Sequence, residues 1–365
     1  MIFQAFRSSD FAHAILADIR RTVSRRWTIM EVCGGQTHAI LHSGIDQLLP
    51  PEIQLIHGPG CPVCVTPIDL IDRAIDLSKS PDTVLATFGD MLRVPGTREN
   101  LFEARAAGGR VEIVGSALQA LDYARLHPEL RVVFFAIGFE TTAPSTAVAV
   151  KQAARENAGN FFILCAHVLV TPAMVSLVNG PARIVQAYLA AGHVSTIMGE
   201  QDYRQLATDY RVPVIVTGFE PVDLLLGIQA AVRQLERGEA RVENMYTRVV
   251  RPEGNRSARA LLDEVFEAED REWRGIGLIP QSGLRLREPF RRFEAPFPGS
   301  ANRPAAAGNN LCIAGAVLQG VKRPIDCPAF GTACTPAMPL GAPMVSTEGT
   351  CAAYYSNHRR SVREG

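Results

Sequence analysis

The chain has 365 residues, of which 47% are hydrophobic, and its formal net charge is zero. This composition predicts two or three domains with cores of their own, and the balanced charge argues against nucleic acid or an anionic membrane as the main partner. The longest apolar stretches are too short to span a bilayer, and the polar N-terminus lacks a signal-peptide core, so we expect a cytoplasmic protein. Because structural disulfides are disfavoured in that compartment, the eight cysteines indicate metal binding, redox chemistry or both.

An amphipathic helix is predicted over residues 9–26, and short apolar runs then alternate with helical patterns as far as about residue 238. The clearest of the later helices covers Ile68–Leu77. Such alternation predicts an α/β fold whose parallel sheets are covered by helices on both faces. The predicted strands are Trp27–Val32, Ile53–His57, Thr83–Phe88, Val111–Val114, Val132–Ile137, Phe161–Ala166, Thr196–Met198 and Val214–Val216.

Two segments of the chain resemble each other, VVFFAIGFETTAP at 132–144 and VPVIVTGFEPVD at 212–223. Each is an apolar strand followed by Gly-Phe-Glu and a helix start, which favours duplication, although two ordinary strand-to-helix turns are the alternative. We therefore predict two related parallel-sheet α/β lobes plus a small C-terminal iron-sulfur cluster domain. The predicted boundaries are 1–27 for an N-terminal helix, 28–145 and 146–270 for the lobes, with chain crossing between them left open, and 271–365 for the C-terminal domain.

Four cysteines near the C-terminus have the spacing Cys312-x14-Cys327-x6-Cys334-x16-Cys351. Structural zinc sites use closer pairs, whereas thiolates from separated loops suit a [4Fe–4S] cluster. Zinc, or four cysteines without metal, are the alternatives. Glu348 lies just before Cys351 and is either a neighbour of the cluster that handles protons or a solvated carboxylate.

Three further cysteines lie in glycine-rich loops, Cys33 in CGGQTH and Cys61 and Cys64 in HGPGCPVC. Cys33 directly follows a predicted strand, where ligands bind in α/β sheets, and nearby backbone N–H groups favour its thiolate. His38, four residues before His42, is a candidate for a soft metal site with Cys33, or else a surface histidine. The C-x-x-C pair adjoins a helix N-terminus and is predicted to be a redox dithiol, with half a zinc site as the alternative.

We expect the Cys33 turn and the Cys61/Cys64 loop, at neighbouring strand ends, to share one cleft. Polar residues at other strand ends are candidates for lining it. Asp90 follows the third predicted strand, and Glu140 follows the fifth, with Glu220 as its counterpart in the repeat. Cys165 lies inside an apolar strand and is predicted to be a buried structural cysteine.

The motifs CGGQTH, HGPGCPVC and GFETTAP, together with the spaced C-terminal cysteines, resemble the HypD family of hydrogenase maturation factors over essentially the whole chain. The family usually has histidine at the position of Gln36, which puts a metal-ligand role there in doubt.

This resemblance implies a role in assembling the Fe(CN)2CO group of [NiFe]-hydrogenases. It implies that Cys33 holds the iron together with a cysteine of a HypC-like small chaperone, and that a HypE-like protein donates cyanide. It also implies that Cys61 and Cys64 form a redox relay with a [4Fe–4S] cluster on Cys312, Cys327, Cys334 and Cys351. From a different class of function, the alternatives are a cluster-dependent thiol–disulfide reductase that does not need Cys33, and a zinc-stabilised small-molecule binding protein.

Overall fold

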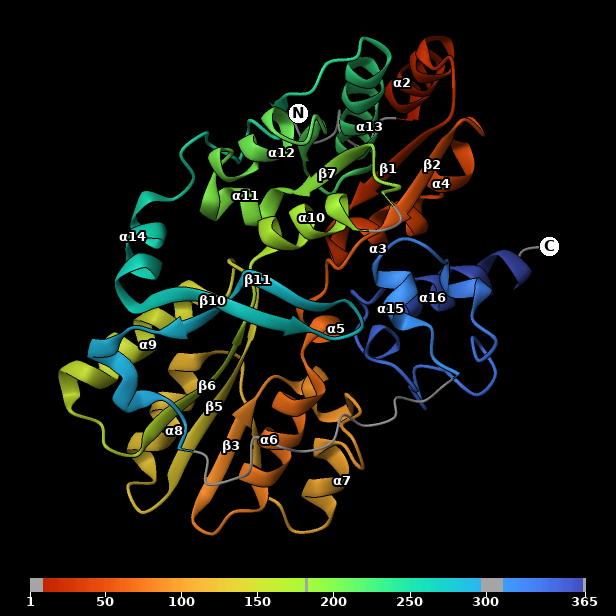
Figure 1. The fold of residues 1–365 in the computed structure, drawn as a ribbon. Coiled ribbons are helices and arrows are strands. Elements are labelled where there is room, and N and C mark those ends of the chain that lie inside the picture. The colour runs from red at the N-terminus through yellow and green to blue at the C-terminus, as the bar shows by residue number, and fades with distance from the viewer. Residues whose placement is uncertain (1–8, 181–182, 297–310, 364–365) are drawn as a thin grey trace.

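The computed structural model describes residues 9–180, 183–296 and 311–363, with side chains described up to residue 357. Two parallel sheets with helices packed on them form most of the molecule, so the predicted α/β class is confirmed (Figure 1). None of the described helices is long and apolar enough to cross a membrane.

The first sheet has five parallel strands in the order β2-β1-β7-β8-β9. These strands are β1 (Trp27–Glu31), β2 (Ile53–His57), β7 (Ala187–Ala191), β8 (Val214–Thr217) and β9 (Val242–Asn244). Helices α2 (Ser9–Thr22) and α13 (Pro221–Glu236) cover one of its faces, where Ile19, Leu225 and Ile228 are fully buried. On the other face, α10 (Val170–Asn179) and α11 (Gly192–Met198) bury a second apolar cluster.

The second sheet has four parallel strands in the order β4-β3-β5-β6. They are β3 (Thr83–Thr87), β4 (Val111–Ile113), β5 (Arg131–Gly138) and β6 (Phe161–His167). β5 is buried along almost its whole length because helices cover both faces of the sheet. These helices are α6 (Ile68–Lys79) and α7 (Leu101–Ala106) on one face, and α8 (Ala117–Leu126), α9 (Ala143–Glu156) and α14 (Arg256–Val265) on the other.

The chain crosses between the sheets twice, so residue 145 does not divide them. β1 and β2 pair in one sheet with β7, β8 and β9, whereas β3 to β6 form the other sheet. The two copies of the Gly-Phe-Glu repeat follow β5 and β8, which lie in different sheets.

One predicted strand is wrong. Thr196–Met198 forms the end of helix α11, and the strand of this part of the chain is β7, at Ala187–Ala191. The other seven predicted strands are confirmed within one or two residues. The N-terminal helix ends at Thr22, four residues earlier than expected.

An antiparallel hairpin of β10 (Phe266–Trp273) and β11 (Gly277–Leu286) lies between the two sheets. It contacts the second sheet at β6 and the first at α10, and the N–H of Leu169 donates to the carbonyl of Ser282 at 2.8 Å. The predicted boundary at residue 271 therefore falls within a hairpin that packs on both sheets.

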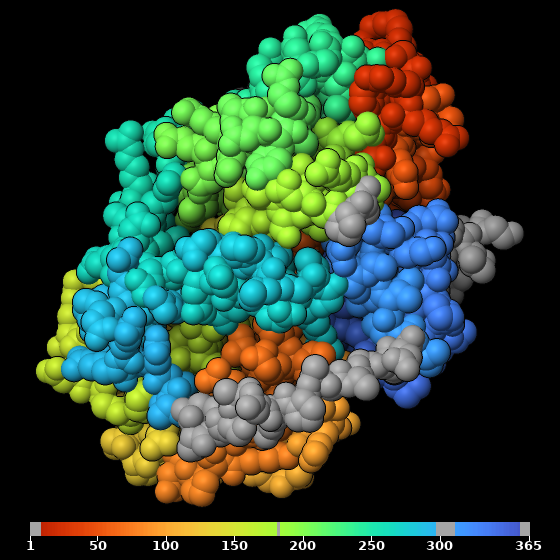
Figure 2. All heavy atoms as spheres, in the orientation of Figure 1, coloured from red at the N-terminus to blue at the C-terminus, as the bar shows by residue number. Residues whose placement is uncertain are grey.

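We call residues 311–363 the C-terminal region. It contains α15 (Ala314–Leu318), α16 (Thr350–Arg363) and the short 3-10 turns η4 (Pro324–Asp326) and η5 (Ala342–Met344). It packs on α3 (Gly34–Ser43) of the first sheet and on α5 (Pro62–Val65), the short helix between the sheets. In Figure 2 this region, in blue, lies beside the hairpin, in cyan.

The remaining short elements are α4 (Ile45–Leu48), α12 (Arg204–Thr208), η1 (Gly89–Arg93), η2 (Gln201–Tyr203) and η3 (Glu288–Phe293).

Candidate functional site

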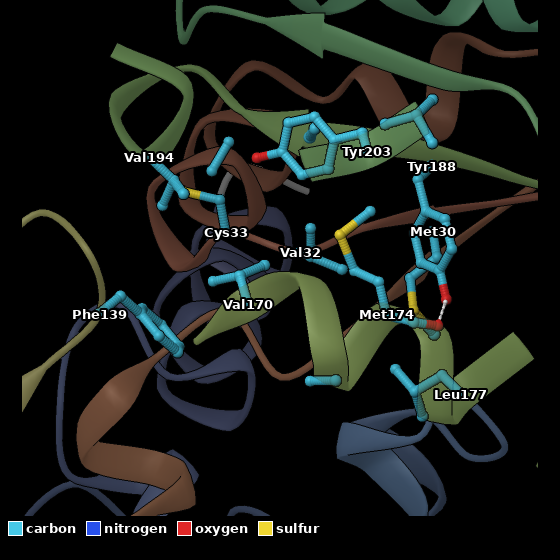
Figure 3. Close-up of a cluster of buried hydrophobic side chains, with 14 of the residues drawn as sticks. Met30, Val32, Cys33, Phe139, Val170, Met174, Leu177, Tyr188, Val194 and Tyr203 are labelled. Atoms are coloured by element: carbon cyan, nitrogen blue, oxygen red, sulfur yellow. Dashed lines mark hydrogen bonds between the residues drawn. The ribbon is translucent and has the colours of Figure 1, made fainter. Parts of the chain in front are cut away.

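Cys33 lies at the carboxyl end of β1, where the chain turns into α3. Its backbone is extended, with φ −148° and ψ 121°, and the helix begins at Gly34. The thiol is buried, with 1% of the residue exposed, among Val170, Val194 and Tyr203 (Figure 3). As the sequence predicts, the thiol stands at a strand-to-helix turn, but it points into an apolar cluster rather than into open solvent.

The imidazole of His193, on the first turn of α11, lies close to the Cys33 thiol. The sulfur lies 3.8 Å from both ring nitrogens. The imidazole stacks on Phe219 with ring centroids 5.3 Å apart and an interplanar angle of 6°. Phe219 belongs to the second Gly-Phe-Glu copy, so the repeat contributes a wall of this site.

Burial keeps Cys33 and His193 neutral. It raises the pKa of the Cys33 thiol far above its ordinary value, and it outweighs the nearby backbone N–H groups of Gln36 and Gly35, which lower it. Burial also lowers the pKa of His193. The N–H groups that the sequence predicts beside Cys33 are therefore present and favour the thiolate, but desolvation is the larger effect and favours the thiol.

The two cysteine loops predicted to adjoin each other are in direct contact. The N–H of Gly34 donates to the carbonyl of Gly60 at 3.0 Å, and a Cβ atom at Gly60 would collide with the backbone of Cys33. Cys61 precedes α5, and its sulfur forms a disulfide with Cys64. Both residues are buried in the same apolar cluster as Cys33.

All four C-terminal cysteines line one apolar recess, together with Ile313, Ala314, Val317, Phe330, Gly341, Pro343 and Met344. We call it the four-cysteine recess. The N–H of Leu340 donates to the sulfur of Cys334 at 3.3 Å, and a Cβ atom at Gly341 would lie 2.5 Å from the sulfur of Cys312. Burial, and then the charge of the neighbouring thiolates, raises the pKa of Cys312 and of Cys351. A cationic group would offset that repulsion.

This donor set fits an iron-sulfur cluster. Within the described residues, no group of three or more His, Cys, Asp or Glu side chains is arranged to hold a single metal ion. A [4Fe–4S] cluster binds its thiolates through different iron atoms, so it does not require all of them to converge on one point. Apolar walls and a backbone N–H aimed at sulfur are the surroundings that such clusters use.

The four-cysteine recess adjoins the disulfide. The sulfur of Cys64 is 4.0 Å from the carbonyl oxygen of Ala342, and the next residue back, Gly341, packs against Cys312. The tip of the hairpin contacts both the α5 segment and the C-terminal region. The N–H of Arg274 donates to the carbonyl of Val65 at 2.9 Å, and the side-chain amide of Gln319 donates to the carbonyl of Gly275 at 3.1 Å.

Glu348 lies beside the Cys33 turn and is close enough to Asp90 to be influenced by its charge. A Cβ atom at Gly34 would collide with the carbonyl oxygen of Glu348, so glycine is required for this close approach. Partial desolvation and the charge of Asp90 raise the pKa of the Glu348 carboxyl, although the residue is exposed. Asp90 is half-buried in η1, and Arg93 of the same turn donates to the carbonyls of Pro336 and Val345, each at 3.0 Å.

Glu140 is buried with 2% of its surface exposed. Its Oε1 accepts the N–H of Val170 at 2.9 Å, whereas Oε2 has no hydrogen-bond partner among the residues that the structure describes. Burial raises its pKa to about 7.

The structure does not bring His38 to the buried thiol. Its side chain is exposed on α3 and stacks on His42, with ring centroids 5.7 Å apart. Gln36 is buried instead, and its amide donates to the carbonyls of Ala190 at 3.2 Å and Thr217 at 3.3 Å. Gln36 therefore ties α3 to the ends of β7 and β8.

Sequence reasoning missed His193 because it missed β7. Ala187–Ala191 contains no β-branched residue, so it lacks the usual strand signal. With that strand in place, the rule that ligand-binding residues follow strand ends would have selected His193.

Comparisons with known proteins show the family of this chain. A sequence model named HypD and described as "Hydrogenase formation hypA family" matches residues 10–358. The chain belongs to the HypD family. Members of the HypD family that are similar to it include the hydrogenase maturation factor HypD of Rhodobacter capsulatus, 44% identical over 362 residues that cover 96% of each chain. The hydrogenase expression/formation protein HupD of Azotobacter chroococcum mcd 1 is 45% identical over 97% of this chain and 96% of its own. The HypD of Escherichia coli (strain K12) is 43% identical over 92% of this chain and 90% of its own.

Proposed function

We propose that this protein acts in hydrogenase maturation, as a scaffold that holds iron on Cys33 while the Fe(CN)2CO group is assembled. Family membership supports the general role. The observation that carries the finer proposal is the contact between three cysteine sites: the Cys33 turn touches the Cys61–Cys64 loop, and that loop touches the wall of the four-cysteine recess. A redox scaffold needs this adjacency.

In this proposal Cys33 is the iron ligand and His193 accepts the proton that the thiol releases when it binds metal. A soft thiolate suits a low-spin iron with cyanide ligands. The 3.8 Å separation between sulfur and imidazole supports the proton transfer, since modest motion brings the two groups into hydrogen-bond range. Because Cys33 is buried, iron loading requires the turn to open toward a partner. That partner is a HypC-like small chaperone contributing a second cysteine, and a HypE-like protein donates cyanide.

Cys61 and Cys64 are the proposed redox pair, and Cys312, Cys327, Cys334 and Cys351 are the proposed ligands of a [4Fe–4S] cluster. Such a cluster supplies single electrons when bound. The Cys64 sulfur, 4.0 Å from the carbonyl of Ala342, gives the dithiol a short connection to the recess.

A thiol–disulfide reductase acting on other proteins is less well supported. Such a reductase would not need Cys33, so it leaves the contact between the Cys33 turn and the Cys61–Cys64 loop without a role.

The test is anaerobic co-purification with the small chaperone, followed by infrared spectroscopy for cyanide and carbonyl stretches. We expect Cys33→Ala to abolish these bands. Cys165→Ala is the matched control, because Cys165 is also a free cysteine but its thiol donates to the carbonyl of Leu284 in β11, outside the site. Full retention of the bands in Cys33→Ala would refute the scaffold.

A further inference from the structure

A continuous line of buried polar groups runs from the Cys33 turn to the C-terminal region. Glu31 and His57 are directly opposite each other at the ends of the parallel strands β1 and β2. The carboxyl Oε1 of Glu31 is 2.6 Å from Nδ1 of His57, and Nε2 of His57 is 3.1 Å from the hydroxyl of Tyr354 in α16. Glu31 is 0% exposed, His57 5% and Tyr354 9%. We call these three residues the Glu31 line.

At one end of the line, the Glu31 carboxyl binds both the start of the Cys33 turn and the first turn of α3. Its Oε2 accepts the N–H of Cys33 at 2.8 Å, and its Oε1 accepts the hydroxyl of Thr37, one turn into α3. A buried carboxylate is costly unless its lone pairs are occupied. Here three donors, from Cys33, Thr37 and His57, occupy them, so the position of the Cys33 backbone depends on where this carboxylate is held.

At the other end, the line is anchored on the helix that carries Cys351. Tyr354 follows Cys351 by three residues, so the two are neighbours on successive turns of α16. The rings of His57 and Tyr354 meet edge to face, with centroids 5.4 Å apart and an interplanar angle of 80°. The C-terminal region thus holds the Cys33 turn at two points, through Tyr354 and through the contact of Glu348 with Gly34.

Each ring nitrogen of His57 has one partner in the line: Nδ1 faces the Glu31 carboxyl, and Nε2 faces the Tyr354 hydroxyl, a group that can both donate and accept. Burial raises the pKa of Tyr354, which keeps its hydroxyl proton available for this bond.

We propose that Glu31, His57 and Tyr354 are positioning residues that couple the placement of the Cys33 thiol to the placement of the helix bearing Cys351. The relevance of this coupling to assembly rests on the proposed function, but the coupling itself is a property of this chain. Through it, a shift of α16 on filling or reducing the four-cysteine recess would be transmitted to the turn that presents Cys33.

The test measures how fast iodoacetamide alkylates Cys33 in the full-length, anaerobically purified protein, by peptide mass spectrometry, with Cys165 as the internal reference. Alkylation of the buried Cys33 reports opening of its turn. Tyr354→Phe removes one oxygen and should raise the Cys33-to-Cys165 rate ratio about fivefold, the effect of losing one buried hydrogen bond. Tyr355→Phe, on the next residue, whose ring packs on Phe330, should leave the ratio unchanged.

Two further variants distinguish a specific role in placing the Cys33 turn from a general loss of stability. Glu31→Gln keeps an acceptor and should raise the ratio less than Glu31→Ala. In the Glu31→Ala background, Tyr354→Phe should have no further effect, because the line is already broken. Where Tyr354→Phe fails to fold, His57→Gln provides the same measurement from the middle of the line.

The proposal is overturned if Tyr354→Phe, or His57→Gln in its place, leaves the ratio at the wild-type value, or if the effects of Glu31→Ala and Tyr354→Phe multiply. It is equally overturned if Tyr355→Phe raises the ratio as much as Tyr354→Phe. Because the assay uses no iron cargo or chaperone, its result is independent of the infrared test of the proposed function.

Discussion

Replacing Glu140 with glutamine should stabilise the protein, and the gain should grow as the pH rises. Burial raises the pKa of Glu140 from 4.5 to about 7. The folded state therefore binds more protons than the unfolded chain between these two values, and its stability falls as the pH rises through that window. Each unit of pKa difference corresponds to about 1.4 kcal/mol. The ionised carboxylate thus lowers the free energy of unfolding by about 3 kcal/mol near pH 7.5, but by less than about 1 kcal/mol at pH 5.

Glutamine has nearly the same shape and retains an oxygen for the N–H of Val170, but it carries no charge to desolvate. The assay is urea unfolding at several pH values from 5 to 8, followed by circular dichroism. The stability difference between Glu140→Gln and wild type should widen by about 2 kcal/mol across this range. Glu220→Gln is the matched control, since Glu220 holds the equivalent place in the repeat but is only half-buried. A difference that is constant with pH, or an equal slope in Glu220→Gln, would refute the reasoning.

Three further predictions concern the packing and the acid stability of the fold. Gly34→Ala should weaken the docking of the C-terminal region, because its Cβ would collide with the carbonyl oxygen of Glu348. Limited proteolysis of residues 311–363 should therefore accelerate about tenfold. The control Gly159→Ala, whose Cβ would meet no described atom within 4 Å, should be cleaved at the wild-type rate. Burial lowers the pKa of His167 from 6.5 to about 4, so the free energy of unfolding decreases as the pH falls from 6.5 to 4. His167→Gln should make the free energy of unfolding less dependent on pH in this range. An unchanged pH dependence would contradict the lowered pKa of His167. Ile228→Ala should lower the free energy of unfolding by about 2–5 kcal/mol in urea titrations, since this side chain of α13 is fully buried in the core of the first sheet. A loss well under about 1 kcal/mol would be inconsistent with that packing.

Most strands could be predicted because their residues carry the local signal of a buried parallel strand. VVFFAIG in β5 and VIVT in β8 are continuous apolar runs rich in β-branched and aromatic residues, bounded by helical patterns. AYLAA in β7 lacks that composition, and its burial between β1 and β8 makes it a strand. Tertiary context overrode local propensity there, and the prediction moved the strand onto Thr196–Met198, which is helical.

No local sequence pattern indicates which of the two sheets a strand joins. A parallel strand of either sheet has the same apolar pattern, so nothing in β3 indicates that it leaves the sheet of β1 and β2. The same limit applies to the hairpin of β10 and β11, whose position between the sheets depends on contacts with residues more than a hundred positions earlier in the chain.

The cysteines were identifiable from residue chemistry and spacing alone, because thiols beside glycines at strand ends, and four thiols on separated loops, are uncommon patterns. Their surroundings were not identifiable in that way. His193, Glu31 and Tyr354 are ordinary residues in the sequence, and each becomes part of the site through partners far along the chain. The neutral state of Cys33 likewise follows from burial by α10 and α11 rather than from its own loop. Local patterns therefore specify which atoms are available for chemistry, whereas desolvation and long-range contacts, which arise only when the chain folds, decide their protonation and their neighbours.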